Sequence, residues 1–379
     1  MAEAIFWLCL LLPVYAYLGY PLLVALLAQA SRPRPSPASA EPPTVSVIVA
    51  AHNEAEHIGA KLRTLLGQDY PGERLQILVA SDGSTDATVA EALASGDPRI
   101  EVLELPRQGK AAALNAAAAR ARGEILVFTD ADNRWMPDCL GELMRAFADP
   151  QVGAAGGHIE ILDGGPHLGL GDQLYRRYET WLRRAESRAG CLVAVDGALL
   201  ALRRELFRPV PAEANDDFFL STCAPAAGRR IQFAERARVL DRGVDEAGKQ
   251  FRRRLRVTVG GLQSLACRRA LMNPLRHGRY AIALLSHKLL RRLAPLLLIP
   301  LLASNLWLWD AGAFYRMLLL AQLGGYALAL AGLLDRGRRL PKPFRLAAFL
   351  LVTLAGMTLG LWQFLRGQRY SLWTPQQNR

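Results

Sequence analysis

The first half of the chain alternates short apolar runs with segments of helical periodicity. Each run has five to seven residues and is rich in valine, isoleucine and leucine, which is typical of strands buried on both faces of a sheet. Because strands that alternate with helices form a mainly parallel sheet, we expect an α/β fold with helices on both faces of that sheet. The expected strands are residues 44–50, 75–80, 100–105 and 125–129, and the expected helices are residues 55–66 and 111–122, the second ended by Gly123.

Four longer apolar segments lie outside this region and are predicted to span a membrane. Residues 4–31 carry no charged side chain, and a helix of that length crosses a bilayer. A cleaved signal peptide would begin with basic residues and have a shorter apolar core, whereas this chain begins with Met-Ala-Glu. The other three spans are expected at residues 293–309, 317–334 and 346–365.

These patterns divide the chain into five parts and predict its orientation. Arg32 and Arg34 follow the first span, which places the next segment in the cytoplasm by the positive-inside rule. The basic loop between the last two spans agrees with that orientation, although the arginines of the tail do not. The parts are a first span (1–31), a linker rich in Pro, Ser and Ala (32–43), a cytoplasmic α/β domain (44–245), basic interfacial helices (246–292) and three spans with a short tail (293–379).

Charge is concentrated in one belt of the sequence. The chain of 379 residues has a formal net charge of +12, and residues 228–292 alone carry 17 Lys/Arg against 4 Asp/Glu. Because this belt runs directly into an apolar segment, it favours an anionic membrane surface over nucleic acid. Residues 280–292 are predicted as an interfacial helix with Lys288, Arg291 and Arg292 on its polar side. The five cysteines form no C-x-x-C pair, which argues against a zinc site and a disulfide framework.

Candidate chemistry gathers where the predicted strands end. Asp130 and Asp132 follow the strand at 125–129, and two carboxylates one residue apart can hold a hard divalent cation that also takes phosphate oxygens. An acidic turn capping the helix that starts near Pro137 is the alternative interpretation. Glu54, Asp82 and Lys110 follow the other strands, so all five should meet at one edge of the sheet. No P-loop occurs, and no G-x-G-x-x-G follows the first strand.

The second half of the domain carries weaker signals. Residues 170–188 have Leu174, Tyr178, Trp181 and Ala185 at helical spacing, which predicts an amphipathic helix packed on the sheet. The acidic pair Asp216 and Asp217 suits either the first turn of a helix or a catalytic role.

Five motifs in order give the chain its resemblance to a known family. They are V-S-V-I-V-A-A-H-N-E, V-A-S-D-G-S-T-D, G-K-A-A-A-L-N, F-T-D-A-D and N-D-D-F-F-L, and the similarity extends from Val45 to the last spans. The chain resembles membrane-integrated family 2 glycosyltransferases, whose catalytic domain has the GT-A fold. The resemblance implies an enzyme that transfers a sugar, with inversion, from a nucleotide-diphospho-sugar, with a UDP-sugar as the expected donor.

The resemblance also implies roles for individual residues. Glu54 and Asp82 would contact the nucleoside, and Lys110, Asn115 and Asp130 would lie along the nucleotide. Asp132, with Asp130, would bind Mg²⁺ or Mn²⁺. Asp217 would be the general base, with Asp216 beside it. The acceptor end and the diphosphate contacts are then expected at Gly197 and Ala198, and at Arg253 and Arg256.

One departure from the family pattern bears on product length. Processive members carry Q-x-x-R-W near the membrane, where this chain has Arg253-Arg254-Leu255-Arg256-Val257 before Gly260. A second register starting at Gln250 also lacks the tryptophan. We therefore expect transfer of single sugars to a lipid-linked or glycan acceptor in envelope or exopolysaccharide assembly, at the inner membrane. The alternatives are a processive polysaccharide synthase and an inactive membrane scaffold; a nucleic-acid partner is not expected, and protein partners are left open.

Overall fold

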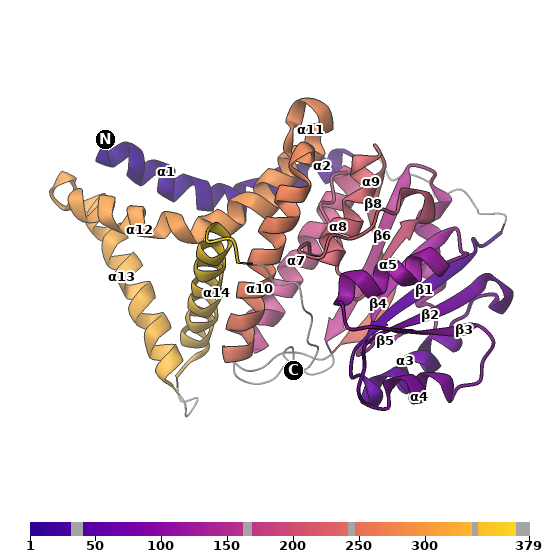
Figure 1. Ribbon diagram of the computed structural model, residues 1–379. Helices are drawn as coiled ribbons and strands as arrows, with labels where there is room; N and C mark the ends of the chain where they lie inside the picture. The colour runs from indigo at the N-terminus through magenta and orange to yellow at the C-terminus, as the bar shows by residue number, and fades with distance from the viewer. Residues whose placement is uncertain (32–40, 162–168, 242–246, 336–339, 369–379) are drawn as a thin grey trace.

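The computed structural model describes residues 1–31, 41–161, 169–241, 247–335 and 340–368. A sheet with its covering helices forms one part of the molecule, and long helices form the other (Figure 1). Helices α7 (Gly169–Ala189) and α10 (Ala247–Cys267) lie between these two parts (Figure 1). The predicted linker at 32–40 and the loop arginines Arg336, Arg338 and Arg339 lie outside the described residues.

The sheet has eight strands in the order β3-β2-β1-β4-β7-β6-β8-β5. Its first four strands are parallel, as predicted, with β1 between β2 and β4. The other half is mixed, because β7 runs antiparallel to both β4 and β6 while β6 and β8 are parallel. The strands are β1 (Val45–Ala51), β2 (Leu75–Asp82), β3 (Ile100–Leu105), β4 (Ile125–Asp130), β5 (Arg134–Trp135), β6 (Val152–Ile161), β7 (Leu200–Arg203) and β8 (Arg230–Asp241).

Helices cover both faces of the sheet, as the continuous apolar strands predicted. Alternate side chains of one strand enter different cores, since successive residues of a strand point to opposite faces. In β1, Ile48 and Ala50 pack with the alanines of α5 (Lys110–Arg120). Val47 and Val49 pack instead with Ile58 and Leu62 of α3 and with the buried side of α6. Here α3 is Ala55–Leu66, α4 is Thr88–Leu93 and α6 is Cys139–Met144.

The prediction that Gly123 ends the preceding helix was wrong. Helix α5 already ends at Arg120, and Ala121 is extended, so Gly123 does not terminate it. A Cβ atom on Gly123 would lie 2.4 Å from the backbone nitrogen of Ser46. A glycine is needed there because the chain passes directly against the start of β1.

Helix α7 also differs from its prediction. Leu174 and Trp181 are exposed by 45% and 40%, whereas Glu179 and Glu186 are buried beside Leu182. The helix packs mainly against α2 (Tyr20–Ala30) rather than on the sheet. Buried carboxylates inside a protein are paired with cations, so the face that packs carries these two glutamates together with the apolar Leu182 and Ala185.

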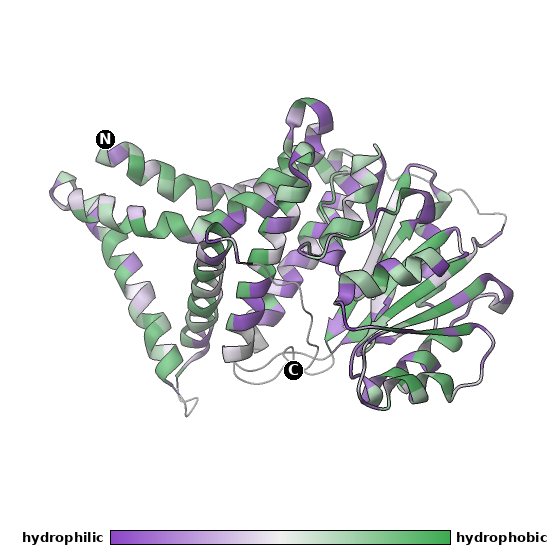
Figure 2. Ribbon diagram, viewed as in Figure 1, coloured by the Kyte–Doolittle hydropathy of each residue, from purple (hydrophilic) through white to green (hydrophobic). Residues whose placement is uncertain are grey.

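Within the described residues, four helical segments are long and apolar enough to cross a membrane, which matches the number predicted. Figure 2 shows hydrophobic residues along α1 (Ala2–Val14), α12 (Arg291–Trp307), α13 and α14, while α7 and α10 carry many hydrophilic ones. Leu18, Leu22, Met317 and Leu334 are among the apolar side chains exposed on these segments by 61% or more, as lipid contact requires. The segments are Ala2–Ala30, Pro274–Trp307, Ala313–Leu334 (α13) and Lys342–Leu365 (α14).

The sequence predicted an interfacial helix at 280–292 and a separate membrane span at 293–309, but the structure does not divide the chain there. Residues 274–307 form one helical segment made of α11 (Pro274–Ala283), a π-helix (Leu284–Leu290) and α12 (Arg291–Trp307), with non-helical backbone at Gly278. Arg291 is buried, so it does not face lipid headgroups as the sequence had suggested. Arg291 binds Glu179 of α7 instead, and Lys288 and Arg292 line a cavity shared with the α/β domain.

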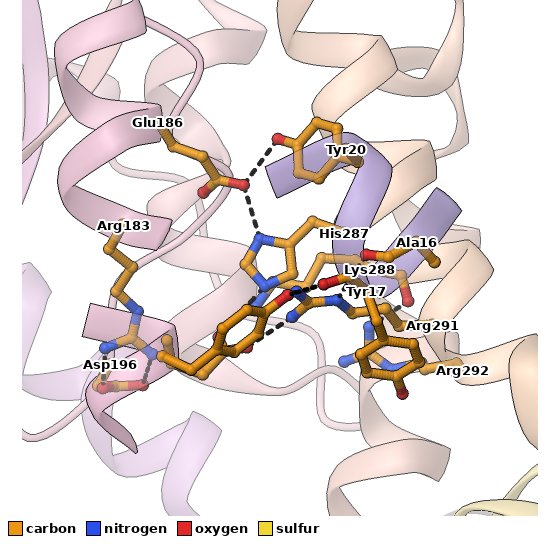
Figure 3. A network of polar contacts seen from close by, with 12 residues as sticks. Ala16, Tyr17, Tyr20, Arg183, Glu186, Asp196, His287, Lys288, Arg291 and Arg292 are labelled. Carbon is orange, nitrogen blue, oxygen red and sulfur yellow. Dashed lines mark hydrogen bonds and ion pairs between the residues drawn. The ribbon is translucent and has the colours of Figure 1, made fainter. Parts of the chain in front are cut away.

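A buried polar network joins the α/β domain to the long helices (Figure 3). His287 places Nδ1 2.7 Å from Glu186 Oε1 and Nε2 3.2 Å from Glu179 Oε2. Arg291 donates to Glu179 Oε1 over 2.5 Å, and the Tyr20 hydroxyl donates to Glu186 Oε1 over 2.7 Å. Burial opposes the charge on Glu179, but His287 and Arg291 outweigh it and hold its pKa well below its ordinary range. The network therefore links α2, α7 and the helix at 274–307.

Removing one hydroxyl from this network is expected to destabilise the protein. Tyr20 is only 1% exposed, so Tyr20→Phe leaves part of a buried carboxylate without its donor and lowers the free energy of unfolding by about 1 kcal/mol. The thermal unfolding midpoint of the full chain in detergent measures this. Tyr315→Phe is the control, because its hydroxyl donates to Glu3 over 3.3 Å at an exposed site. Equal midpoints for the two variants would contradict a stabilising role of the network.

Candidate active site

A cavity of about 510 Å³ opens where the sheet meets the long helices. Its walls come from the ends of β1 and β4, from the loop before β7, and from α7, α8 (Asp216–Ser221), α10 and the helix at 274–307. Ten of the twelve predicted site residues line it, and two do not. Those in the lining are Glu54, Lys110, Asp130, Asp132, Gly197, Ala198, Asp216, Asp217, Arg253 and Arg256.

Lys110 draws the two acidic pairs together. Its Nζ lies 2.8 Å from Asp130 Oδ1 at the end of β4 and 2.8 Å from Asp216 Oδ2 at the start of α8. Burial opposes the charge on Lys110, but the two carboxylates outweigh it and raise its pKa, so the amine stays protonated. Gly109 precedes the helix with φ 96°, a conformation that favours glycine and lets α5 begin at Lys110.

Asp132 is the carboxylate best placed to ligate a cation. It is exposed to the cavity, and no hydrogen bond or ion pair joins it to another described residue, whereas Asp130 is held by Lys110. The described residues contain no group of three or more His, Cys, Asp or Glu that could hold a metal. The two carboxylates therefore fit a hard divalent cation that takes its remaining ligands from diphosphate and water.

Asp217 has the environment of a proton acceptor. Burial, with the nearby charges of Asp216 and Asp196, raises the pKa of Asp217 to about 6. Gly197 faces it, and a Cβ atom added to Gly197 would lie 3.3 Å from Asp217 Cβ. The absence of a side chain at Gly197 thus keeps open the space in front of the carboxylate.

The backbone of Ala198 ties the acceptor loop to the acidic turn. Its carbonyl accepts from Thr129 Oγ1 over 2.8 Å and from Asn133 Nδ2 over 3.3 Å. These two residues flank Asp130 and Asp132 in the sequence. The loop predicted to bind acceptor and the turn predicted to bind cation therefore hold each other in place.

Asp82 and Asn115 do not line the cavity. Asp82 is 1% exposed at the end of β2 and accepts hydrogen bonds from the backbone of Gln108 and Gly109, at 2.7 and 2.9 Å. The amide of Asn115 donates to the carbonyl of Val210 over 3.0 Å and accepts from its backbone nitrogen over 2.8 Å. Both side chains hold neighbouring loops in place through hydrogen bonds to the backbone. Neither side chain lines the cavity in which the donor is expected to bind.

Lys61 was missed by the sequence reading. It lies on the buried side of α3 and donates from Nζ to Thr129 Oγ1 over 2.8 Å and to Asn133 Oδ1 over 2.5 Å. Burial lowers the pKa of Lys61 to about 7. In the sequence, Lys61 occupies an ordinary position of a predicted helix. Its location on the same helical face as Ile58, Leu62 and Leu65 was the one sign that it is buried.

The cavity lining also contains charged residues that were not predicted as site residues, among them Arg183, Asp196, Lys288 and Arg292. Arg183 grips Asp196 through two hydrogen bonds, at 2.5 and 2.8 Å, on the side of the cavity nearest α7. Lys288 and Arg292 reach the same cavity from the helix at 274–307. None could be assigned from motifs, because their elements meet only in three dimensions.

Comparison with known proteins gives this site its context. Residues 46–208 match the family described as glycosyl transferase family 2. The mannosyltransferase PcManGT from Pyrobaculum calidifontis, solved with GDP-Man and Mn²⁺, is similar with a TM-score of 0.72 and 27% identity. That similarity covers 97% of this chain and 100% of the other. The fold and the cavity thus define a GT-A glycosyltransferase domain. Residues 46–208 of this domain are the part that matches glycosyl transferase family 2.

Curated relatives match over a shorter length. An N-acetylglucosaminyltransferase of Rhizobium meliloti is 31% identical over 255 residues, which are 60% of this chain and 59% of that protein. A beta-monoglucosyldiacylglycerol synthase of Synechocystis is 35% identical over 153 residues, 37% of this chain and 32% of that protein. The chain therefore spans less than two thirds of either relative. The Mn²⁺ in the similar structure is consistent with a divalent cation at this site, and the four candidate spans indicate a membrane protein.

Proposed function

We propose that this protein transfers a single sugar, with inversion, from a nucleotide-diphospho-sugar to a lipid-linked or glycan acceptor. One observation carries the proposal: Lys110 brings the cation-binding turn and the acidic pair of α8 into one cavity. A UDP-sugar remains the expected donor, although the similar structure holds GDP-Man. The inner membrane, a cytoplasmic catalytic domain and a role in envelope or exopolysaccharide assembly are part of the same proposal.

The donor would lie along the edge formed by β1 and β4. Glu54 lines the nucleoside end of the cavity, and Asp132 with Asp130 would hold Mg²⁺ or Mn²⁺ against the diphosphate. When bound, the cation supplies charge stabilisation for the departing nucleoside diphosphate. Arg256, which interacts electrostatically with Asp216 and Asp130, would lie beside the same diphosphate and stabilise its developing negative charge.

The acceptor would enter between Gly197 and α10, in front of Asp217. As its hydroxyl oxygen bonds to the anomeric carbon, the proton passes to the Asp217 carboxylate and the bond to the diphosphate oxygen breaks with its electron pair. Attack from the side opposite the leaving group inverts the anomeric configuration. Asp216, held by Lys110, raises the pKa of Asp217 and so makes it a better proton acceptor.

Val257 supports single transfer over a processive synthase. It lines the cavity where processive members of the family are expected to place tryptophan, and it is 39% exposed. A valine offers no aromatic surface on which a growing sugar chain could stack.

The rate of transfer is expected to rise with pH through about 6 and to level off above it. Asp217 acts as a base only when ionised, and its pKa of about 6 means that the carboxylate predominates above that pH. Initial rates with saturating donor, measured from about pH 5 to about pH 8, test this. Nucleotide binding measured over the same range separates loss of the base from loss of donor. A rate that stays flat or falls as the pH passes 6 contradicts the assignment.

The proposed function is tested with full-length protein purified in detergent. UDP- and GDP-sugars are offered in turn with Mn²⁺ or Mg²⁺ and a membrane lipid extract, and nucleotide release and labelled product are followed. Metal-dependent release of one nucleotide with a labelled acceptor supports the proposal and names the donor. Products of many sugar units would instead identify a processive synthase, and no turnover by folded protein on any donor would favour the inactive scaffold.

A further inference from the structure

The cavity has an excess of positive charge on the wall nearest the long helices. Some charged groups in its lining are paired: Lys110 with Asp130 and Asp216, Arg176 with Asp172, and Arg183 with Asp196. In contrast, several cations of the lining have no ion pair within the described part of the chain. They are Arg253, Arg254 and Arg256 from α10, and Lys288 and Arg292 from the helix at 274–307.

Lys288 and Arg292 form a pair of cations one helical turn apart. Arg292 donates from Nη1 to the backbone carbonyl of Lys288 over 2.8 Å, which folds its guanidinium back over the lysine. Figure 3 shows both side chains beside the polar network of Glu186 and His287. Glu179, the nearby carboxylate, uses its two oxygens to bind His287 and Arg291, and it forms no ion pair with Lys288 or Arg292.

A glycine of α10 allows Arg292 to take this position. A Cβ atom on Gly261 would lie 2.2 Å from Arg292 Nη2 and 2.7 Å from its Cζ. Any larger residue at 261 would displace the guanidinium. Arg292 can therefore pass close to α10 only because residue 261 is a glycine. In this position its guanidinium lines the cavity.

The two cations lie on the acceptor side of the proposed base. Arg292 interacts electrostatically with Asp217 and Tyr175, while Arg256 interacts with Asp216 and Asp130. Arg256 thus belongs to the donor side of the cavity. An anion bound beside Arg256 does not by itself account for Arg292 and its neighbour Lys288, because Arg292 interacts with Asp217 and not with Asp216 or Asp130.

An anion that occupies this position would be of a particular chemical class. Unpaired cations held inside a protein are costly unless a ligand neutralises them, and an arginine next to a lysine suits the oxygens of a phosphate. The cations project from a segment long and apolar enough to cross a membrane, so a ligand reaching them can keep its apolar part in the bilayer.

We propose that Lys288 and Arg292 bind the phosphate or diphosphate group of a membrane-embedded lipid acceptor. This site would hold the lipid so that the hydroxyl to be glycosylated faces Asp217. The inference rests on the proposed function and adds the acceptor's chemical class: an anionic lipid with a phosphate ester near its reactive end. A neutral glycolipid would leave both cations without a partner.

The test uses a long-chain lipid phosphate as the probe. Dodecyl phosphate is titrated into full-length protein in neutral detergent micelles, with dodecanol and inorganic phosphate as separate arms, and binding is followed by calorimetry. Arg292→Gln is expected to weaken dodecyl phosphate binding about tenfold or more, because a charge-assisted contact is lost. Gly261→Ala is expected to weaken it too, since it displaces the guanidinium without removing a charge.

Arg279→Gln is the matched control, because it removes the same charge from an exposed position on the same helical segment. It should leave binding unchanged, and Arg292→Lys should recover part of the lost affinity. Equal affinity of wild type and Arg292→Gln would overturn the proposal. So would dodecanol or inorganic phosphate binding as tightly as dodecyl phosphate.

Nucleotide binding in the same preparations separates this inference from the proposed function. UDP or GDP with Mn²⁺ should bind wild type and Arg292→Gln equally, because the donor lies on the other side of Asp217. Intact nucleotide binding together with dodecyl phosphate binding that ignores Arg292 rejects the phosphate site and leaves the transferase in place. Loss of nucleotide binding in wild type, with dodecyl phosphate binding kept, would reject the transferase instead.

Discussion

Asp217→Asn is expected to lower the rate of sugar transfer about 10²-fold or more while leaving donor affinity unchanged. Asparagine has nearly the same size but cannot accept the acceptor's proton, so the hydroxyl must attack while still protonated. The donor side is untouched, since the cation-binding turn and Lys110 keep their contacts. Initial rates at saturating donor, with nucleotide affinity from a separate titration, measure the two effects.

Two comparisons make this result specific. Asp138→Asn changes an exposed aspartate outside the cavity in the same way and should retain the wild-type rate. The rise in rate through about pH 6 should also vanish in Asp217→Asn, because the group that titrates there is gone. Transfer at a near-normal rate would remove Asp217 from the role of base and direct attention to Asp196, which precedes Gly197 and also lines the cavity.

Asp132→Ala is expected to abolish the metal dependence of donor binding. Asp132 is exposed to the cavity and has no partner among the described residues, while Asp130 is neutralised by Lys110. Without Asp132, the remaining carboxylate for the cation is Asp130, which is already paired with Lys110. The two negatively charged phosphates of the donor then face the acidic turn without a cation between them. The affinity for the nucleoside diphosphate, measured with and without Mn²⁺, should become weak and equal in the two conditions.

Asp138→Ala serves as the control, since it removes an exposed aspartate from outside this cavity. A donor affinity that still depends on Mn²⁺ in Asp132→Ala would show that the cation is held elsewhere. Asp130 and Asp216 would then be the next candidates, with Lys110 moving away from them when the donor binds.

The sequence predicted much of the sheet because local patterns determine those elements. The strands at 100–105 and the helix at 55–66 have the predicted bounds, and β1, β2 and β4 differ from theirs by one or two residues. Continuous apolar runs of this kind are typical of strands that are buried on both faces of a sheet. They therefore show which residues form these strands. The four candidate spans were predicted for a similar reason, since length and apolar composition suffice.

Most of the predicted site residues line one cavity, because the ends of parallel strands meet at one edge of the sheet. Asp130, Asp132, Glu54 and Lys110 all reached the cavity from this rule alone. The rule could not tell which side chains at that edge point into the cavity. Asp82 and Asn115 lie near it but bind backbone groups of neighbouring loops, and only the folded positions of those loops show this.

What the sequence determined by itself was the α/β class, the four apolar spans and the acidic edge of the sheet, because each follows from short-range pattern and chain length. What only the tertiary structure decided was the far wall of the cavity. The local pattern predicted that Lys288 and Arg292 lie on the polar side of an interfacial helix, whereas they line the cavity. It did not predict that Glu179 and Glu186 of α7 are buried. The partners of Glu186 and Glu179, which are His287 and Arg291, lie about 100 residues away in the sequence, and no local pattern predicts a contact over such a separation. Packing α7 against the helix at 274–307 buries these charges together, and burial then dictates which pairs form and which cations remain open to a ligand.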